Sequence, residues 1–161
     1  MIFEQLIYTD LGCASYLVGC QKVGEAVVVD PALDTQALDR ALEYHKARLV
    51  GVIETHTHAD HISGHGALAL ELGVPVYVSA LAGAAHDHIG LKDGDSINVG
   101  NIELRTMHTP GHRPEHIALE VIDHTRSDEP WLLLTGDSLF VGDVARPDLA
   151  VDGEEGAAVL Y

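Results

Sequence analysis

The residues best suited to chemistry form one short segment, His56-Thr57-His58-Ala59-Asp60-His61. It places three imidazoles and one carboxylate within six residues. Imidazole nitrogen and carboxylate oxygen bind zinc, manganese or non-haem iron, and the segment has no thiolate to favour a softer metal. A solvated loop would explain a single histidine, but it does not explain four such groups together. The segment therefore predicts a metal site.

Two further segments each offer one ligand of the same kind. His112 stands in a Pro-Gly turn, HTPGH, and Asp137 follows an apolar run over residues 131–134. Either residue alone could be an ordinary loop or turn residue. All three segments, however, follow predicted strands, so together they predict a nitrogen and oxygen ligand set at strand ends.

Alternating strands and helices must position these residues. Three apolar runs at the N-terminus predict an antiparallel meander, and Leu38, Leu42 and His45 recur at helical spacing. The continuous apolar run before His56 predicts a buried strand. The expected strands are 2–9, 15–19, 26–30, 49–55, 74–79, 101–107, 116–123 and 131–137, and the expected helices are 35–46, 61–73 and a short one after Asp152.

The length and charge of the chain exclude several classes of function. With 161 residues we expect one domain over 1–161, and 9 Lys plus Arg against 25 Asp plus Glu give a formal charge of −16. Such an acidic chain disfavours nucleic acid and anionic membrane surfaces as partners. Because the N-terminal residues do not resemble a signal peptide and no apolar run reaches about 20 residues, we expect a cytoplasmic protein.

The first segment matches the HxHxDH signature of the metallo-β-lactamase superfamily, and His112 in TPGH and Asp137 in GD match its next two motifs. The resemblance covers nearly the whole chain. It implies an α/β fold, a four-layer αββα sandwich with the metal at one edge of the two sheets. Superfamily members continue with further strands, helices and a last histidine. We therefore expect a domain truncated at its C-terminal side, with one sheet face uncovered.

Residues 135–149, TGDSLFVGDVARPDL, resemble the persulfide dioxygenases and their rhodanese-fused relatives, whereas glyoxalase II enzymes usually read GCGR at 143–146. The resemblance implies a single Fe(II), with Zn(II) as the alternative. The implied metal ligands are His56, His112 and Asp137, and the implied catalytic residues that orient them are His58, Asp60 and His61. Arg146 is the implied contact for the glutathione carboxylates, unless it only pairs with Asp143 or Asp148.

The leading hypothesis is an Fe(II) persulfide dioxygenase that converts glutathione persulfide to sulfite and glutathione. The alternatives are a glyoxalase II-type zinc thioester hydrolase and a truncated, non-catalytic metal-binding domain. We expect a small glutathione-linked substrate as partner, and either a homo-oligomer or a rhodanese domain in the parent chain. We interpret the other histidines as structural or surface residues: His45, His65, His86, His88, His108, His116 and His124.

Overall fold

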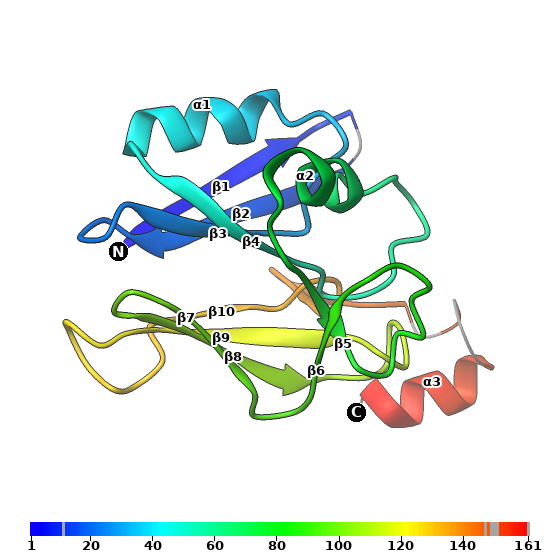
Figure 1. The fold of residues 1–161 in the computed structure, drawn as a ribbon. Coiled ribbons are helices and arrows are strands. Elements are labelled where there is room, and N and C mark those ends of the chain that lie inside the picture. The colour runs from blue at the N-terminus through cyan, green and yellow to red at the C-terminus, as the bar shows by residue number, and fades with distance from the viewer. Residues whose placement is uncertain (11, 147, 149–151, 161) are drawn as a thin grey trace.

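The computed structural model describes residues 1–10, 12–146, 148 and 152–160. Two β-sheets are stacked face to face, and two helices cover the outer side of the larger sheet (Figure 1). In spatial order that six-stranded sheet contains β1 (Ile2–Tyr8), β2 (Cys13–Cys20), β3 (Glu25–Val29), β4 (Arg48–Ile53), β5 (Val76–Ser79) and β6 (Ile89–Leu91).

The first three strands pair antiparallel, as the sequence predicts, and β3 to β6 pair parallel. Parallel neighbours need a long crossover, which α1 (Gln36–His45) supplies between β3 and β4, and α2 (His65–Leu72) between β4 and β5. Because β3, β4 and β5 run in the same direction, the residues that follow them meet at one edge of the sheet.

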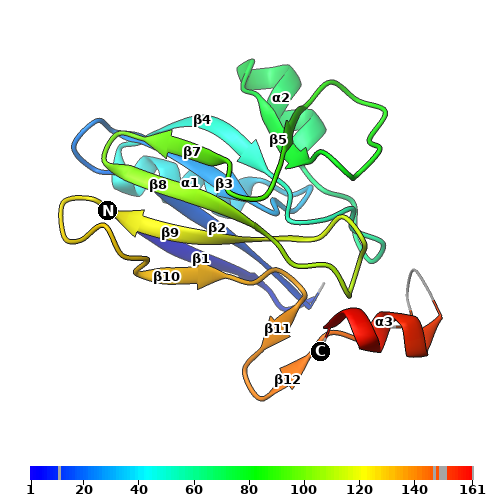
Figure 2. The same cartoon turned by 90° about the horizontal axis from the view of Figure 1, so that it is seen from below.

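The second sheet is antiparallel, with the order β10-β9-β8-β7. Its strands are β7 (Ser96–Val99), β8 (Ile102–His108), β9 (Ile117–Asp123) and β10 (Leu132–Leu134). A small hairpin of β11 (Leu139–Phe140) and β12 (Asp143–Val144) follows, and then α3 (Gly153–Leu160). Figure 2 shows the hairpin and α3 beyond the end of the sheets rather than over them.

Two apolar layers hold this arrangement together. Val29, Ile53 and Leu119 belong to the layer between the sheets, and Leu38 and Leu68 pack from the helices onto the larger sheet. Burying each such side chain stabilises the fold by roughly 1.5–3 kcal/mol. The predicted α/β fold with two stacked sheets is confirmed. Among the described residues, no helix is long and apolar enough to cross a bilayer.

The structure corrects two predicted boundaries. The helix expected from residue 61 begins at His65, because the Gly64 N–H donates to the carbonyl of Pro31. The Ser63 hydroxyl lies within hydrogen-bond distance of that carbonyl and of Glu54 Oε1. These bonds hold the segment before α2 against the end of β3. The buried strand expected over 131–137 is only Leu132–Leu134, and it lies at a sheet edge where Leu133 is 45% exposed.

Four short strands were not expected from the sequence, namely β6, β7, β11 and β12. Each has two to four residues, too few for an alternating pattern to be visible. The turn predicted between β6 and β7 is present, since the Asp95 N–H donates to the carbonyl of Lys92.

Candidate metal centre

The predicted ligands lie where strands of both sheets end. His56 follows β4 of the larger sheet, His112 lies in the loop between β8 and β9, and Asp137 follows β10. A hydrogen bond of 2.8 Å from the Ile117 N–H to the carbonyl of Thr55 joins the two sheets at this edge. Residues far apart in sequence therefore meet at one place.

His56, His112 and Asp137 form one group, in which one ligand atom of each lies within 4.8 Å of the others. Asp137 Oδ2 lies 3.8 Å from His56 Nε2 and 3.7 Å from His112 Nε2. Two ligands on one zinc ion are about 3.3 Å apart at the usual bond lengths. The three groups thus surround a space that fits a transition-metal ion, and their assignment as ligands stays a prediction.

The proton on His56 is fixed by a hydrogen-bonded chain behind it. Thr55 Oγ1 donates to Asp30 Oδ2 over 2.8 Å, and it lies 2.9 Å from His56 Nδ1. Since the hydroxyl proton is used on Asp30, Nδ1 of His56 must carry the proton and donate to Thr55. The lone pair of His56 therefore lies on Nε2, the atom that faces Asp137.

The ionisation of the group suits a cation. Burial, with the charge of the neighbouring His58 adding to its effect, lowers the pKa of His56 to about 2, so the ring is neutral as a ligand must be. Burial also raises the pKa of Asp137, with the charges of Asp30 and Asp60 adding to the shift and His112 opposing it. A cation beside this carboxylate would compensate for both burial and repulsion.

His116 positions Asp137, although the sequence does not distinguish it from the other histidines. It is fully buried, and its Nε2 accepts a hydrogen bond of 3.1 Å from the Asp137 backbone N–H. Its Nδ1 lies 2.9 Å from the hydroxyls of both Thr109 and Ser138. The available signal is its place at the start of an apolar strand, four residues after His112.

His58 lies between two carboxylates that the sequence did not single out. Its Nε2 is 3.2 Å from Asp30 Oδ1 and 3.0 Å from Glu54 Oε2. Burial alone would lower the pKa of His58, but the hydrogen bonds and charges of Asp30 and Glu54 outweigh it and raise the pKa to about 10. Both carboxylates directly follow apolar strands, the same signal that pointed to His56.

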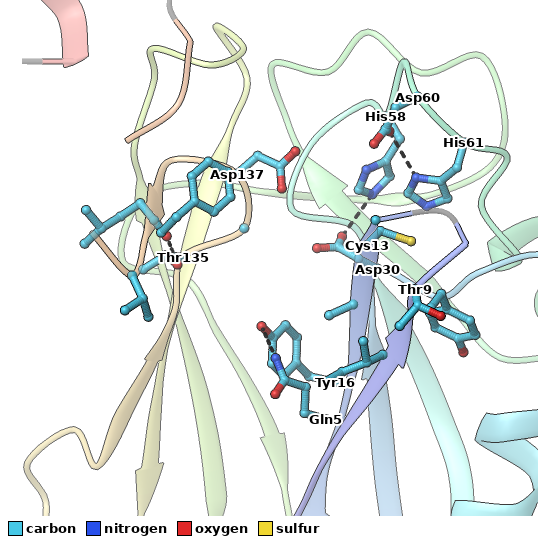
Figure 3. Close-up of a pocket in the computed structure, with 18 residues that line it drawn as sticks. Gln5, Thr9, Cys13, Tyr16, Asp30, His58, Asp60, His61, Thr135 and Asp137 are labelled. Atoms are coloured by element: carbon cyan, nitrogen blue, oxygen red, sulfur yellow. Dashed lines mark hydrogen bonds and ion pairs between the residues drawn. The ribbon is translucent and has the colours of Figure 1, made fainter. Parts of the chain in front are cut away.

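Asp60 and His61 complete a second ligand group with His58. Asp60 Oδ1 and His61 Nδ1 are 3.1 Å apart, while the buried His61 Nε2 has no hydrogen-bond partner within the described part of the chain. In Figure 3, these residues and Asp137 face each other across a cavity of about 500 Å³. The three predicted catalytic residues thus lie beside the metal-ligand group, and their catalytic roles stay predictions.

The loop that carries His112 is fixed to the first motif. Glu115 accepts hydrogen bonds from the Thr57 N–H at 3.2 Å, from the Thr57 hydroxyl and from Arg113 Nε at 3.2 Å. Burial would raise the pKa of Glu115, but these bonds lower it. The buried Glu115 carboxylate therefore holds the two motifs together.

Arg146 is beside the site but is engaged elsewhere. Its guanidinium donates two hydrogen bonds to the Asp148 carboxylate, of 2.8 and 2.9 Å. This is the pairing that the sequence offered as the alternative to a substrate contact. It also lines a hollow of about 380 Å³ together with His112, Asp137 and Phe140. Its predicted contact with substrate stays a prediction. Pro147 and Leu149 of the RPDL segment lie outside the described residues.

Known proteins resemble this chain in sequence. The profile of the metallo-beta-lactamase superfamily matches residues 8–159. The human protein "Persulfide dioxygenase ETHE1, mitochondrial" is 38% identical over 150 residues, which cover 91% of this chain and 56% of that protein. A hydroxyacylglutathione hydrolase of Polaromonas is 35% identical over 129 residues, 78% of this chain and 47% of that enzyme. The chain thus spans about half the length of these relatives.

Solved structures agree with this relationship. A metallo-beta-lactamase from Staphylococcus aureus superposes with a TM-score of 0.93 at 38% identity, covering 99% of this chain and 49% of that one. ETHE1 from Myxococcus xanthus superposes with a TM-score of 0.84 at 32% identity, covering 100% of this chain and 67% of that one. The chain therefore belongs to the metallo-beta-lactamase superfamily, has its αββα type of fold and is similar to its persulfide dioxygenases.

Proposed function

We propose that the protein is an Fe(II)-dependent persulfide dioxygenase that oxidises glutathione persulfide to sulfite and glutathione. The observation that carries this proposal is the convergence of His56, His112 and Asp137 within 4.8 Å. Two histidines and one carboxylate form the ligand set typical of non-haem iron oxygenases. The 38% identity to human ETHE1 supports the same activity.

Each side chain of the site has a defined task in this reaction. Thr55 and Asp30 keep the lone pair of His56 on Nε2, and His116 holds the Asp137 backbone. Three ligands leave positions open, and a ferrous ion held there would supply the redox chemistry between oxygen and sulfur. One persulfide, one O₂ and one water balance one sulfite, one glutathione and two protons.

Substrate would enter the cavity in front of Asp137. Its volume of about 500 Å³ suits a small molecule, and both Asp137 and Cys13 line it. We propose that Arg146 releases Asp148 when substrate binds and then pairs with a carboxylate of glutathione. Arg presents a planar, permanently charged fork that matches a carboxylate, and the chain otherwise carries an excess of negative charge.

A zinc-dependent thioester hydrolase is the second candidate. It is favoured by the group of His58, Asp60 and His61, which offers ligands for a further ion, and by the identity to the Polaromonas hydrolase. Zinc would then lower the pKa of a bound water that attacks the thioester carbonyl. A non-catalytic metal-binding domain is the third.

Metal content and oxygen uptake separate these candidates. The full chain is prepared without oxygen, its iron and zinc are measured, and oxygen consumption and sulfite formation are followed with glutathione persulfide. We expect one iron per chain and equal moles of oxygen consumed and sulfite formed. His112→Ala should abolish both, whereas His124→Ala, which changes a histidine paired with Glu103 and Asp128, should not. Two zinc ions with thioester hydrolysis and no oxygen uptake would instead establish the hydrolase.

Partners and location are proposed on the same basis. We propose a small glutathione-linked substrate and no nucleic-acid or membrane partner. We also propose a cytoplasmic location, and either a homo-oligomer or a rhodanese domain in the parent chain. The formal charge of −16 supports the exclusion of nucleic acid. Sedimentation of the purified chain gives the oligomeric state directly.

A further inference from the structure

Glu54, His65 and His86 gather outside the group formed by His56, His112 and Asp137. Glu54 directly follows β4, His65 opens α2, and His86 lies in the loop between β5 and β6. The ring centroids of His65 and His86 are 4.6 Å apart, with an angle of 30° between the ring planes. The fold thus brings two imidazoles and a carboxylate together from three separate segments.

The contact between Glu54 and His65 has the separation of two metal ligands. Glu54 Oε1 and His65 Nδ1 are 3.2 Å apart, close to the roughly 3.3 Å between two ligands on one zinc ion. This nitrogen is nevertheless buried without a hydrogen-bond partner in the described part of the chain. Such an orphaned donor or acceptor is costly in a folded protein, and a shared cation would satisfy it.

The carboxylate of Glu54 is buried, and a cavity lies beside it. Glu54 is 4% exposed; its Oε1 lies 2.5 Å from the Ser63 hydroxyl, and its Oε2 lies 3.0 Å from His58 Nε2. A cavity of about 170 Å³ is lined by Glu54, His65 and His86, and also by His56, His58 and His61 of the candidate metal centre. His86 is exposed, and its ring must turn to bring a nitrogen toward Glu54 and His65.

We propose that Glu54, His65 and His86 form a second site for a divalent transition metal of the zinc class. The donors are two nitrogens and one oxygen without a thiolate, and water would supply the fourth position of a tetrahedral site. The site opens to solvent through His86. Glu54 also pairs with His58, so the carboxylate links this site to the surroundings of the first one. The proposal does not depend on the proposed dioxygenase activity.

The test counts ions on the full chain after its first site is filled with iron under anaerobic conditions. Zn²⁺ is titrated against a chromophoric chelator, and Co²⁺ is added separately because tetrahedral Co²⁺ has a distinct visible absorption. We expect one further ion per chain. His86→Ala should weaken its binding at least tenfold and leave the iron content unchanged, and His65→Ala should do the same.

Two matched variants make the result specific. His124→Ala removes another partly exposed histidine and should leave zinc binding unchanged. His112→Ala should lose iron but keep the zinc ion that depends on His86. Thermal unfolding monitored by circular dichroism verifies that each variant is folded. The proposal is overturned if the iron-loaded protein binds no further zinc, or if His86→Ala and His65→Ala bind it as tightly as the unchanged protein, which would mean adventitious binding only.

Discussion

Asp30 acts on the predicted ligand His56 through Thr55 rather than by direct contact. Its two carboxylate oxygens accept hydrogen bonds from the Thr55 N–H at 2.7 Å and the Thr55 hydroxyl at 2.8 Å, and Oδ1 also faces His58. Its backbone has a φ of 50°, in the left-handed region that Asp tolerates better than most residues. This one side chain therefore fixes both the proton on His56 and the position of His58.

Asp30→Asn should destabilise the metal-free protein by about 2 kcal/mol, because an amide keeps only one acceptor oxygen and removes the charge opposite His58. Equilibrium unfolding in urea at neutral pH measures this change. Asp128→Asn, at a side chain that is 92% exposed, is the control and should stay within about 0.5 kcal/mol. Equal small effects of the two substitutions would show that Asp30 does not have this role.

The buried His116 should make stability depend on pH. Burial lowers the pKa of His116 from 6.5 to about 4, with charge on His112 adding to the shift. The unfolded chain therefore takes up a proton that the native protein does not, and stability is lost as pH falls below about 6.5. His116→Gln should reduce this slope by up to about 1.4 kcal/mol per pH unit between about pH 6 and 5.

The measurement is urea unfolding of metal-free protein at several pH values in that range. His124→Gln is the control, since the pKa of His124 is raised by Asp128 and Glu103, so it stays protonated throughout. An unchanged slope in His116→Gln would contradict the assignment of His116 as a buried neutral group.

The turn between β10 and β11 positions Asp137, and Gly136 makes this turn possible. Gly136 has a φ of 49°, and a Cβ added to it would lie 2.6 Å from His116 Nε2 and 2.8 Å from Thr55 Oγ1. The backbone thus passes so close to the two residues that hold the ligands that a side chain has no space. The loop carrying His112 is fixed in a comparable way by Glu115.

Gly136→Ala should therefore move Asp137 and lower both stability, by roughly 3 kcal/mol, and the metal content. Gly142→Ala is the matched control, because Gly142 also has a positive φ, of 82°, but an added Cβ there meets nothing within 4 Å. It should cost about 1 kcal/mol and leave the metal content unchanged. Metal analysis and urea unfolding measure the metal content and the stability of both variants. Full metal content in Gly136→Ala would contradict the close-packed turn.

At the scale of the whole molecule, the predicted metal ligands come from both sheets. His56 comes from the larger sheet, whereas His112 and Asp137 come from the smaller one. The outer face of the smaller sheet is not uniformly apolar, since Arg105 there pairs with Glu103 at 3.0 Å and with Glu120 at 3.5 Å. This differs from the uncovered apolar face that is expected from the sequence.

A metal that joins the sheets should stabilise the folded protein. At a free Fe²⁺ concentration 100 times the dissociation constant, binding raises the free energy of unfolding by about 2.7 kcal/mol. For a chain of this size that corresponds to a rise in Tm of roughly 5–10 °C. Anaerobic thermal unfolding with Fe²⁺ and with a chelator measures it. His112→Ala should lose most of this gain and His124→Ala should keep it. A Tm that does not respond to the metal would show that the three ligands do not bind it together.

The sequence alone determined the ligand types and the elements that carry them. The HxHxDH segment after an apolar run, the TPGH turn and the GD aspartate pointed to ligand types at strand ends, which are local properties, and the resemblance implied His56, His112 and Asp137 as the ligands. For the same reason the meander and both main helices were predicted from local pattern, whereas the double-sheet α/β fold was implied by the resemblance to the superfamily. Very short strands were missed because pairing with neighbouring strands, rather than local pattern, creates them.

Only the tertiary structure decided which polar residues support the ligands. His116, Asp30 and Glu54 have no distinctive spacing relative to His56 or Asp137 in the sequence, and their roles follow from contacts across the two sheets. The pairing of His65 with His86 likewise depends on how α2 and the loop after β5 pack. Hydrogen bonds and ion pairs between distant segments depend on distances of a few ångströms, and these are fixed only when the sheets close on their shared core.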